Sequence, residues 1–84
     1  MNEKELQILN LLDSQYKYLA RDKDGKLFIY TTKPQKQSTN GVWDISQNSD
    51  GISLEFNMFS ELFRNIHWED AEPFKIIRDT SNGQ

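Results

Sequence analysis

The sequence contains no cysteine, so neither disulfide bonds nor thiolate metal sites can stabilise the fold. Its four glycines are isolated, which excludes a glycine-rich loop of the kind that binds phosphate. No apolar run approaches the ~18 residues of a membrane span, and the first residues lack the basic and apolar segments of a signal peptide. We therefore expect a cytoplasmic protein that is stabilised by packing, to which its ten aromatic residues contribute.

The chain is short. Its 84 residues fit one domain, which we place at residues 1–78, followed by a polar tail at 79–84 that we expect to be disordered. A chain of this size buries only about 60–65% of its unfolded surface. A deep active-site cleft would take volume from an already small core, so we expect a protein that is not an enzyme.

Charge is unevenly distributed along the chain. The net charge is −3, yet residues 16–36 carry +4 between segments 1–15 and 37–84, which carry −2 and −5. Such patterning indicates surfaces that could contact a charged partner, although a solvated surface is the simpler interpretation of the acidic group. The candidate contact residues are Arg21, Lys23, Lys26, Lys33, Lys36, Glu69, Asp70 and Glu72.

The patterns predict an α+β fold with an N-terminal helix, a four-stranded antiparallel meander, a second short helix and a short C-terminal strand. The first helix is expected at residues 3–13. Asn2 is suited to cap it, and Glu5 stands at the spacing of a capping box. The apolar stripe expected to face the core consists of Ile8, Leu9 and Leu12. The remaining leucines of the helix indicate a second buried side or a contact with a partner.

Residues 16–21 and 26–32 are predicted to form a β-hairpin, because an Asp-Gly turn separates two runs of aromatic and aliphatic residues. A three-residue loop with Gly25 as a bulge would pair Tyr18 with Tyr30 and Ala20 with Phe28. A two-residue loop would instead mix aromatic and aliphatic residues on both faces. We favour the first register because it separates two sets: Tyr16, Tyr18, Phe28 and Tyr30 on one face, and Leu19, Leu27 and Ile29 on the other.

Residues 33–41 are predicted to be a flexible loop. Two further strands follow at residues 42–46 and 52–56, separated by a turn at 47–51, and they complete the meander. In the last of these strands Ile52, Leu54 and Phe56 alternate with polar residues and are expected to face the core.

Asn57 is predicted to cap a second helix at residues 58–65. The helical spacing of its apolar residues is carried by Phe59, Leu62, Phe63 and Ile66. Trp68 is expected to pack over the end of this helix, and residues 74–77 are expected to form the last strand.

Catalytic and metal motifs are weak. The segment at residues 22–25 resembles the start of a calcium loop, but Lys26 and Lys33 occupy the fifth and twelfth positions, where oxygen ligands are needed. His67 with Glu69 is the only cluster with acid–base potential, and no nucleophile or second histidine accompanies it. We expect no catalytic residue, no cofactor and no metal.

Aromatic residues interleaved with cations suggest a second interpretation. On a sheet face, Tyr18, Tyr30 and Trp43 could stack on the bases of a single-stranded nucleic acid, with flanking lysines adding salt-dependent affinity. Against this, the chain is acidic overall, whereas nucleic-acid-binding domains are usually basic. An aromatic face that is covered by other elements is simply a core.

A frame of residues resembles small uncharacterised proteins of phages and prophages in Gram-positive bacteria. The frame covers most of the chain from Tyr16 to Pro73. It comprises residues 16–27, Tyr30, Lys33-Pro34, Trp43, Leu62-Phe63, Ile66, Trp68-Glu69-Asp70 and Glu72-Pro73. The resemblance implies a setting in the cytoplasm of a bacterial host, and it supplies no site residues.

These observations together favour a small accessory protein that acts by protein–protein contact with a host or phage protein. The alternative is the single-stranded nucleic-acid-binding module. We expect a monomer that does not bind membranes, because Lys17 and Lys33 would discourage sheet edges from pairing with another chain.

Overall fold

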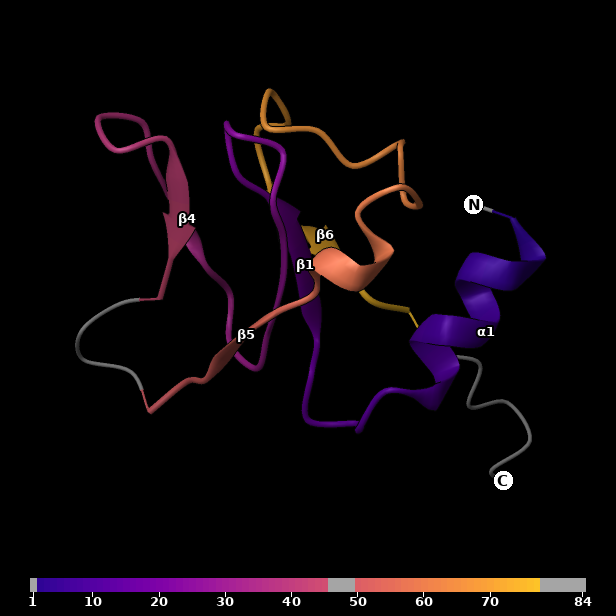
Figure 1. Cartoon of the computed structure of the whole chain (residues 1–84). Helices are drawn as coiled ribbons and strands as arrows, with labels where there is room; N and C mark the ends of the chain where they lie inside the picture. Colours follow the sequence, from indigo (N-terminus) through magenta and orange to yellow (C-terminus); the bar gives the residue numbers. More distant parts are fainter. Residues whose placement is uncertain (1, 46–49, 78–84) are drawn as a thin grey trace.

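The computed structural model describes residues 2–45 and 50–77, and it has the predicted α+β class. One helix precedes a four-stranded antiparallel sheet, and a separate two-stranded sheet packs beside it (Figure 1). The helix is α1 (Glu3–Leu11), and a 3-10 turn, η1, spans Asn57–Phe59. The larger sheet has the order β5 (Ser53–Glu55), β2 (Leu27–Tyr30), β1 (Tyr18–Arg21), β6 (Phe74–Lys75), and the smaller one pairs β3 (Gln35–Gln37) with β4 (Val42–Asp44). The predicted tail at 79–84, residue 46 of the third predicted strand and most of the turn at 47–51 lie outside the described residues.

The capping box of α1 is confirmed. The Asn2 Oδ1 atom accepts a hydrogen bond from Glu5 N at 2.8 Å, and Glu5 Oε1 accepts one from Asn2 N at 3.1 Å. Leu9 is buried, and the other two members of the predicted stripe are partly buried against the same cluster. The helix ends at Leu11, two residues earlier than predicted.

The hairpin of β1 and β2 has the register that we favoured. Tyr18 pairs with Tyr30 and Ala20 with Phe28. Gly25 has a φ of +94°, a conformation that L-residues with a side chain rarely adopt, which is why a glycine suits the bulge. Consequently the aliphatic residues of both strands point to one face of the sheet and most of the aromatic residues to the other.

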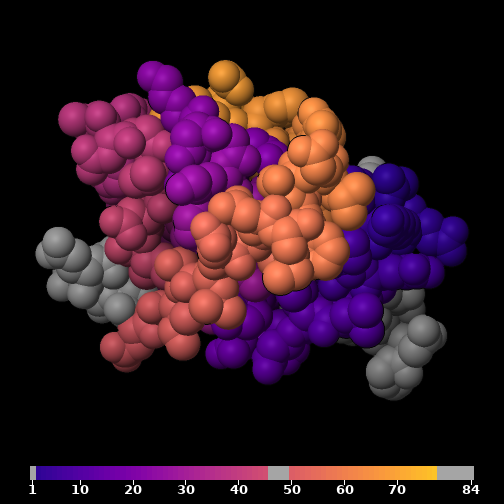
Figure 2. Space-filling view, in the orientation of Figure 1, coloured from indigo at the N-terminus to yellow at the C-terminus, as the bar shows by residue number. Residues whose placement is uncertain are grey.

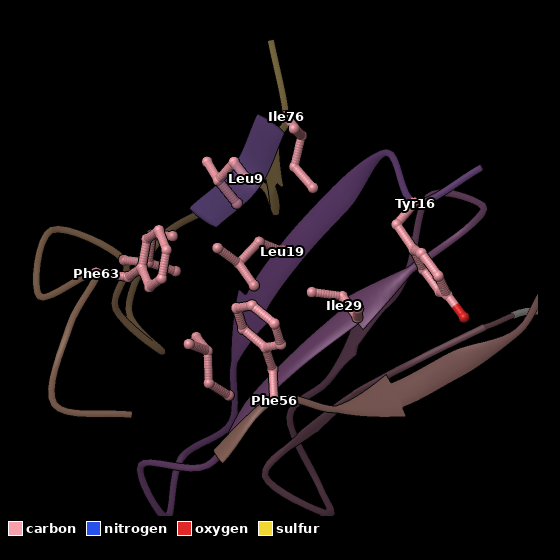
Figure 3. Packing of buried hydrophobic residues seen from close by; sticks show 9 residues of the cluster. Leu9, Tyr16, Leu19, Ile29, Phe56, Phe63 and Ile76 are labelled. Atoms are coloured by element: carbon pink, nitrogen blue, oxygen red, sulfur yellow. The ribbon is translucent and has the colours of Figure 1, made fainter. Parts of the chain in front are cut away.

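The aliphatic face carries the main core (Figure 3). It packs against α1, η1 and the irregular segment at residues 60–66. The buried members are Leu9, Tyr16, Leu19, Leu27, Ile29, Phe56, Phe63, Ile66 and Ile76. The placement of Tyr16 on the aromatic face was wrong, because this residue precedes β1 and turns its ring into the main core.

The opposite face carries a second, smaller core under the β3–β4 hairpin, which lies on the far side of the sheet from α1 in Figure 1. Its buried members are Ala20, Tyr30 and Trp43, with Tyr18, Phe28, Ile45 and Trp68 packed around them. The Tyr30 hydroxyl donates to the Trp43 carbonyl at 3.3 Å, and burial raises the pKa of Tyr30. The aromatic residues of the hairpin therefore bury themselves against another sheet.

The prediction of a four-stranded meander was wrong in which strands pair with each other. Part of the predicted flexible loop forms β3, which pairs with β4 instead of continuing the first sheet. Besides the bond from the Tyr30 hydroxyl, two more hydrogen bonds hold this hairpin over the aromatic face: Asp22 Oδ1 accepts from the backbone N–H of Trp43 at 2.9 Å, and Gly41 O accepts from Lys23 N at 3.0 Å. The place beside β2 is taken by β5, and β6 confirms the expected strand at the C-terminal end, paired with β1.

The second helix is reduced to the three residues of η1. Phe63 has a φ of +57°, which no helix can accommodate, and its N–H donates to Glu5 Oε2 at 2.5 Å. Several carbonyls that a helix would use internally instead accept hydrogen bonds from Arg21. The expected cap residue, Asn57, accepts from Leu27 N at 2.8 Å and so joins η1 to β2.

The apolar alternation of the 52–56 segment is only partly buried. Phe56 is 6% exposed, but Ile52 and Leu54, which we expected to face the core, are 48% and 47% exposed. The reason is that α1 lies at the other end of the sheet from β5 (Figure 1). The β5 edge therefore retains an apolar surface without a covering element among the described residues.

Candidate functional site

A groove forms where the basic loop of the sequence meets the acidic segment. Its volume is about 310 Å³. One wall comes from the approach to β3 and from β4, and the other from the segment that precedes β6. The lining residues are Lys33, Pro34, Gln35, Lys36, Trp43, Ala71, Glu72 and Pro73. Three of the eight predicted contact residues, Lys33, Lys36 and Glu72, line it, although they lie up to 39 positions apart in the sequence.

Lys36 fastens the two walls together. Its Nζ atom donates to the carbonyls of Trp68 at 2.5 Å and Asp70 at 2.8 Å. The same ammonium lies 5.2 Å from the ring centre of Trp43 and 4.6 Å from that of Trp68, distances at which a cation is attracted to an aromatic face. The two indoles meet edge to face, with ring centres 6.3 Å apart. Trp43 and Trp68 therefore form an aromatic cage around the ammonium group of Lys36 (the Lys36 cage). The prediction that Trp68 packs over the end of a helix was wrong.

An exposed ion pair joins the groove walls at a second point. Lys33 Nζ lies 2.6 Å from Glu72 Oε1, and both side chains are more than half exposed. The hydrogen bond to Glu72, with the attraction between the charges, raises the pKa of Lys33. Because ion pairs between exposed side chains contribute little to stability, a ligand could displace this pair at small cost.

Trp43 has an unsatisfied donor. The residue is 6% exposed as a member of the second core, and its Nε1–H has no hydrogen-bond acceptor among the described residues. An unpaired buried donor costs about 1–3 kcal/mol, and most buried polar groups in folded proteins are paired. The residue that forms part of the groove wall therefore holds an unused hydrogen-bonding group.

Arg21 is placed away from the groove and is fully occupied. Its guanidinium donates to the carbonyls of five residues, at distances from 2.8 to 3.3 Å: Gly25, Ser60, Leu62, Phe63 and Ile66. Because a guanidinium has five N–H donors, none remains for a ligand. Arg21 also borders a hollow of about 230 Å³ beside Arg64 and His67, but its role there is to shape the segment at 60–66.

The other predicted contact residues lie on the surface. Lys23 and Lys26 are exposed at the tip of the first hairpin, and Glu69 is exposed beside Trp68. Asp70 is half-buried and closes a turn, because its Oδ2 accepts from His67 N at 3.0 Å. The structure thus brings Lys36 and Asp70 together and pairs Lys33 with Glu72, while the hairpin-tip lysines stand apart from them.

The predicted stacking platform for bases is not exposed. Tyr30 is 1% and Trp43 6% exposed, and Tyr18 is half-buried beside them. In this conformation the three rings form the second core, so a nucleic acid could reach Tyr30 and Trp43 only if the β3–β4 hairpin moved away.

The described residues, 2–45 and 50–77, show neither a metal-binding cluster nor a membrane-spanning helix. They contain no group of three or more histidine, aspartate or glutamate side chains that could hold a metal ion. They also contain no helix with the length and apolar character that crossing a membrane requires.

Sequence reasoning missed two residues of the site. Pro34 is buried in the groove wall, and Asp22 ties β4 to the first hairpin. Asp22 was assigned to a turn, and a turn aspartate gives no sign in the sequence that its carboxylate accepts from a backbone amide 21 positions away. Comparisons of the chain with models of protein families, with curated proteins and with solved structures gave no match.

Proposed function

We propose that the protein acts by protein–protein contact and that the groove between the β3–β4 hairpin and residues 68–73 binds an extended segment of a partner. The observation that carries the proposal is the open groove itself, whose two walls are joined by the exposed Lys33–Glu72 ion pair that a bound segment could displace. The indole N–H of Trp43 is buried and unpaired. A backbone carbonyl of the bound segment could accept from it, and remove the cost of leaving it unpaired, only if the β3–β4 hairpin shifted. The small volume suits a few residues of an extended chain rather than a large ligand.

The charges at the groove support a protein partner over a nucleic acid. Glu72 stands at the groove and would repel phosphates, while Lys33 is already paired with it. Two of the three aromatic residues that would stack on bases are buried. The resemblance to phage and prophage proteins agrees with this role, and we place the contact in the cytoplasm of a bacterial host.

The proposal predicts that filling the groove abolishes capture of a partner. Ala71 is exposed and lines the groove, so Ala71→Arg would occupy it while leaving the Lys36 cage intact. We expect the amount of partner retained by a tagged chain from bacterial lysate, after nuclease treatment and at about 0.3 M salt, to fall at least about tenfold. The matched control is Asn40→Arg, which adds the same charge at the exposed turn of the β3–β4 hairpin and should retain the partner.

Each other outcome of this experiment contradicts the proposal. Equal retention by both variants would place the contact elsewhere on the molecule. A signal that disappears with nuclease would favour the nucleic-acid alternative. Failure of the unaltered chain to retain any protein across hosts and growth stages would count against a contact role altogether.

A further inference from the structure

The two edges of the four-stranded sheet differ in how they are protected. The β6 edge consists of two residues, follows Pro73 and carries Lys75, all of which hinder the addition of another strand. The β5 edge has neither proline nor lysine, and all three of its residues are exposed. The lysines that led us to expect a monomer lie elsewhere, because Lys17 precedes the central strand β1 and Lys33 lies between β2 and β3.

The hydrogen bonds to β2 define which backbone groups of β5 point outward. Ile52 O accepts from Thr31 N at 3.0 Å, and Phe56 N donates to Leu27 O at 2.8 Å. Because backbone groups alternate in direction along an antiparallel strand, the outward N–H and C=O groups belong to Ser53 and Glu55. A strand added to this edge would pair through these two residues.

The β5 edge is surrounded by apolar side chains that the fold leaves in solvent. Ile52 and Leu54 are each about half exposed, and Met58, in the 3-10 turn η1 that follows β5, is 82% exposed. In Figure 2 the salmon-coloured atoms around residues 50–56 lie at the surface of the molecule. Leu54 is paired with Ile29, so it shares the face of the main core and extends that apolar row to the edge of the sheet.

We propose that this edge pairs with β5 of a second copy of the chain, in an antiparallel arrangement centred on Leu54. This register pairs Ser53 of each copy with Glu55 of the other, which are the residues with outward backbone groups. It also places Leu54 against Leu54 and Ile52 against Phe56 on the core face, so the half-exposed apolar side chains cover one another. The result is one continuous eight-stranded sheet with a two-fold axis.

Charge decides among the neighbouring registers. Glu55 is the one charged residue of β5, and a register centred on it would set two carboxylates directly opposite each other, which is destabilising. Centring on Leu54 instead sets each carboxylate opposite a serine hydroxyl, which can donate to it. It also keeps residues 52–56 paired over their whole length.

The first test measures the mass of the unaltered chain by sedimentation equilibrium from roughly 10 µM to roughly 1 mM. We expect the mass to rise toward twice that of the monomer, and to rise no less in about 0.3 M salt, because salt screens the repulsion between two chains of net charge −3. Leu54→Lys should remain monomeric, whereas Ile77→Lys, which adds the same charge at a residue that is 77% exposed beside β6, should still associate. A constant monomer mass for the unaltered chain would overturn the proposal.

A second test reads the register. The chain has no cysteine, so Leu54→Cys would carry a single thiol. Directly opposed residues at a non-hydrogen-bonded antiparallel site have Cα atoms about 4.5 Å apart, within the roughly 4.4–6.8 Å range of disulfides. We expect rapid covalent dimerisation on mild oxidation, and none at the same rate for Leu11→Cys, whose residue is 87% exposed on α1. Equal rates for the two variants would contradict pairing through β5.

Discussion

Replacing Arg21 by methionine is expected to lower the free energy of unfolding by about 3 kcal/mol. Its guanidinium satisfies five backbone carbonyls, and four of these belong to the segment at 60–66 that closes over the main core. A hydrogen bond to a charged group contributes about 1.5–3 kcal/mol. The total loss of stability is expected to be well below five times this value, because Arg21 is only half-buried and water can reach some of the freed carbonyls.

Arg64 offers a matched control. It is exposed, and within the described part of the chain its guanidinium donates to the carbonyl and the carboxylate of Glu61, three positions earlier. Arg64→Met removes the same charge and is expected to change the free energy of unfolding by less than about 0.5 kcal/mol. Urea denaturation followed by tryptophan fluorescence measures both variants. Similar losses for Arg21→Met and Arg64→Met would show that charge, and not the carbonyl bonds, explains the effect.

A second large effect is expected at Asp22, which fastens the β3–β4 hairpin to the first hairpin. Asp22→Ala leaves the backbone N–H of Trp43, which is buried, without its acceptor. We expect this variant to lower the free energy of unfolding by about 1–3 kcal/mol. Asp22→Asn keeps an oxygen at that position and removes the buried charge, so we expect it to be at least as stable as the unaltered chain at neutral pH. The same denaturation experiment at neutral pH checks both expectations.

The stability difference at Asp22 should depend on pH in a defined direction. Burial, the largest cause, raises the pKa of Asp22 above 3.8; Asp24 and Asp44 add to the shift, while the Trp43 N–H and Lys26 oppose it. Because the folded chain binds the proton more tightly than the unfolded chain, the contribution of Asp22 to stability is fully present below pH 3.8 and is lost as the pH rises through the folded pKa.

The advantage of Asp22→Asn should therefore be greatest above the folded pKa of Asp22 and shrink as the pH falls toward 3.8. Denaturation series of both chains at several pH values between about 3.5 and 7 measure it. A difference that does not vary with pH, or an asparagine variant that is less stable at neutral pH, would contradict this account of the buried carboxylate.

Features governed by neighbours in the sequence were predictable. The capping box of α1 depends on Asn2 and Glu5, three positions apart, and the register of the first hairpin depends on Gly25 and on the separation of aromatic from aliphatic residues. In both cases one short segment contains all the groups that decide the local structure. Such patterns were sufficient for the fold class.

Features governed by distant partners were not predictable. Nothing in the sequence near residues 58–65 indicates that the Arg21 side chain will donate hydrogen bonds to the carbonyls of this segment. The helical spacing of its apolar residues therefore led to the wrong prediction of a helix. The bipolar charge pattern placed Lys33, Lys36 and Glu72 among the candidate contact residues, but it treated the basic and acidic groups as two surfaces. The structure joins them in one groove, since Lys36 reaches carbonyls more than 30 positions away.

The position of β6 has a consequence for how the chain is made. The central strand β1 lies in the first quarter of the sequence, yet among the described residues one of its two edges pairs with residues 74–75 and with Ile76, whose N–H donates to Lys17 O. A chain still attached to the ribosome and ending before residue 74 presents that side bare, with the fully buried Leu19 beside it. The sheet therefore cannot close until residues 74–76 have been synthesised, and proteolytic removal of these residues would leave β1 as an unprotected edge strand.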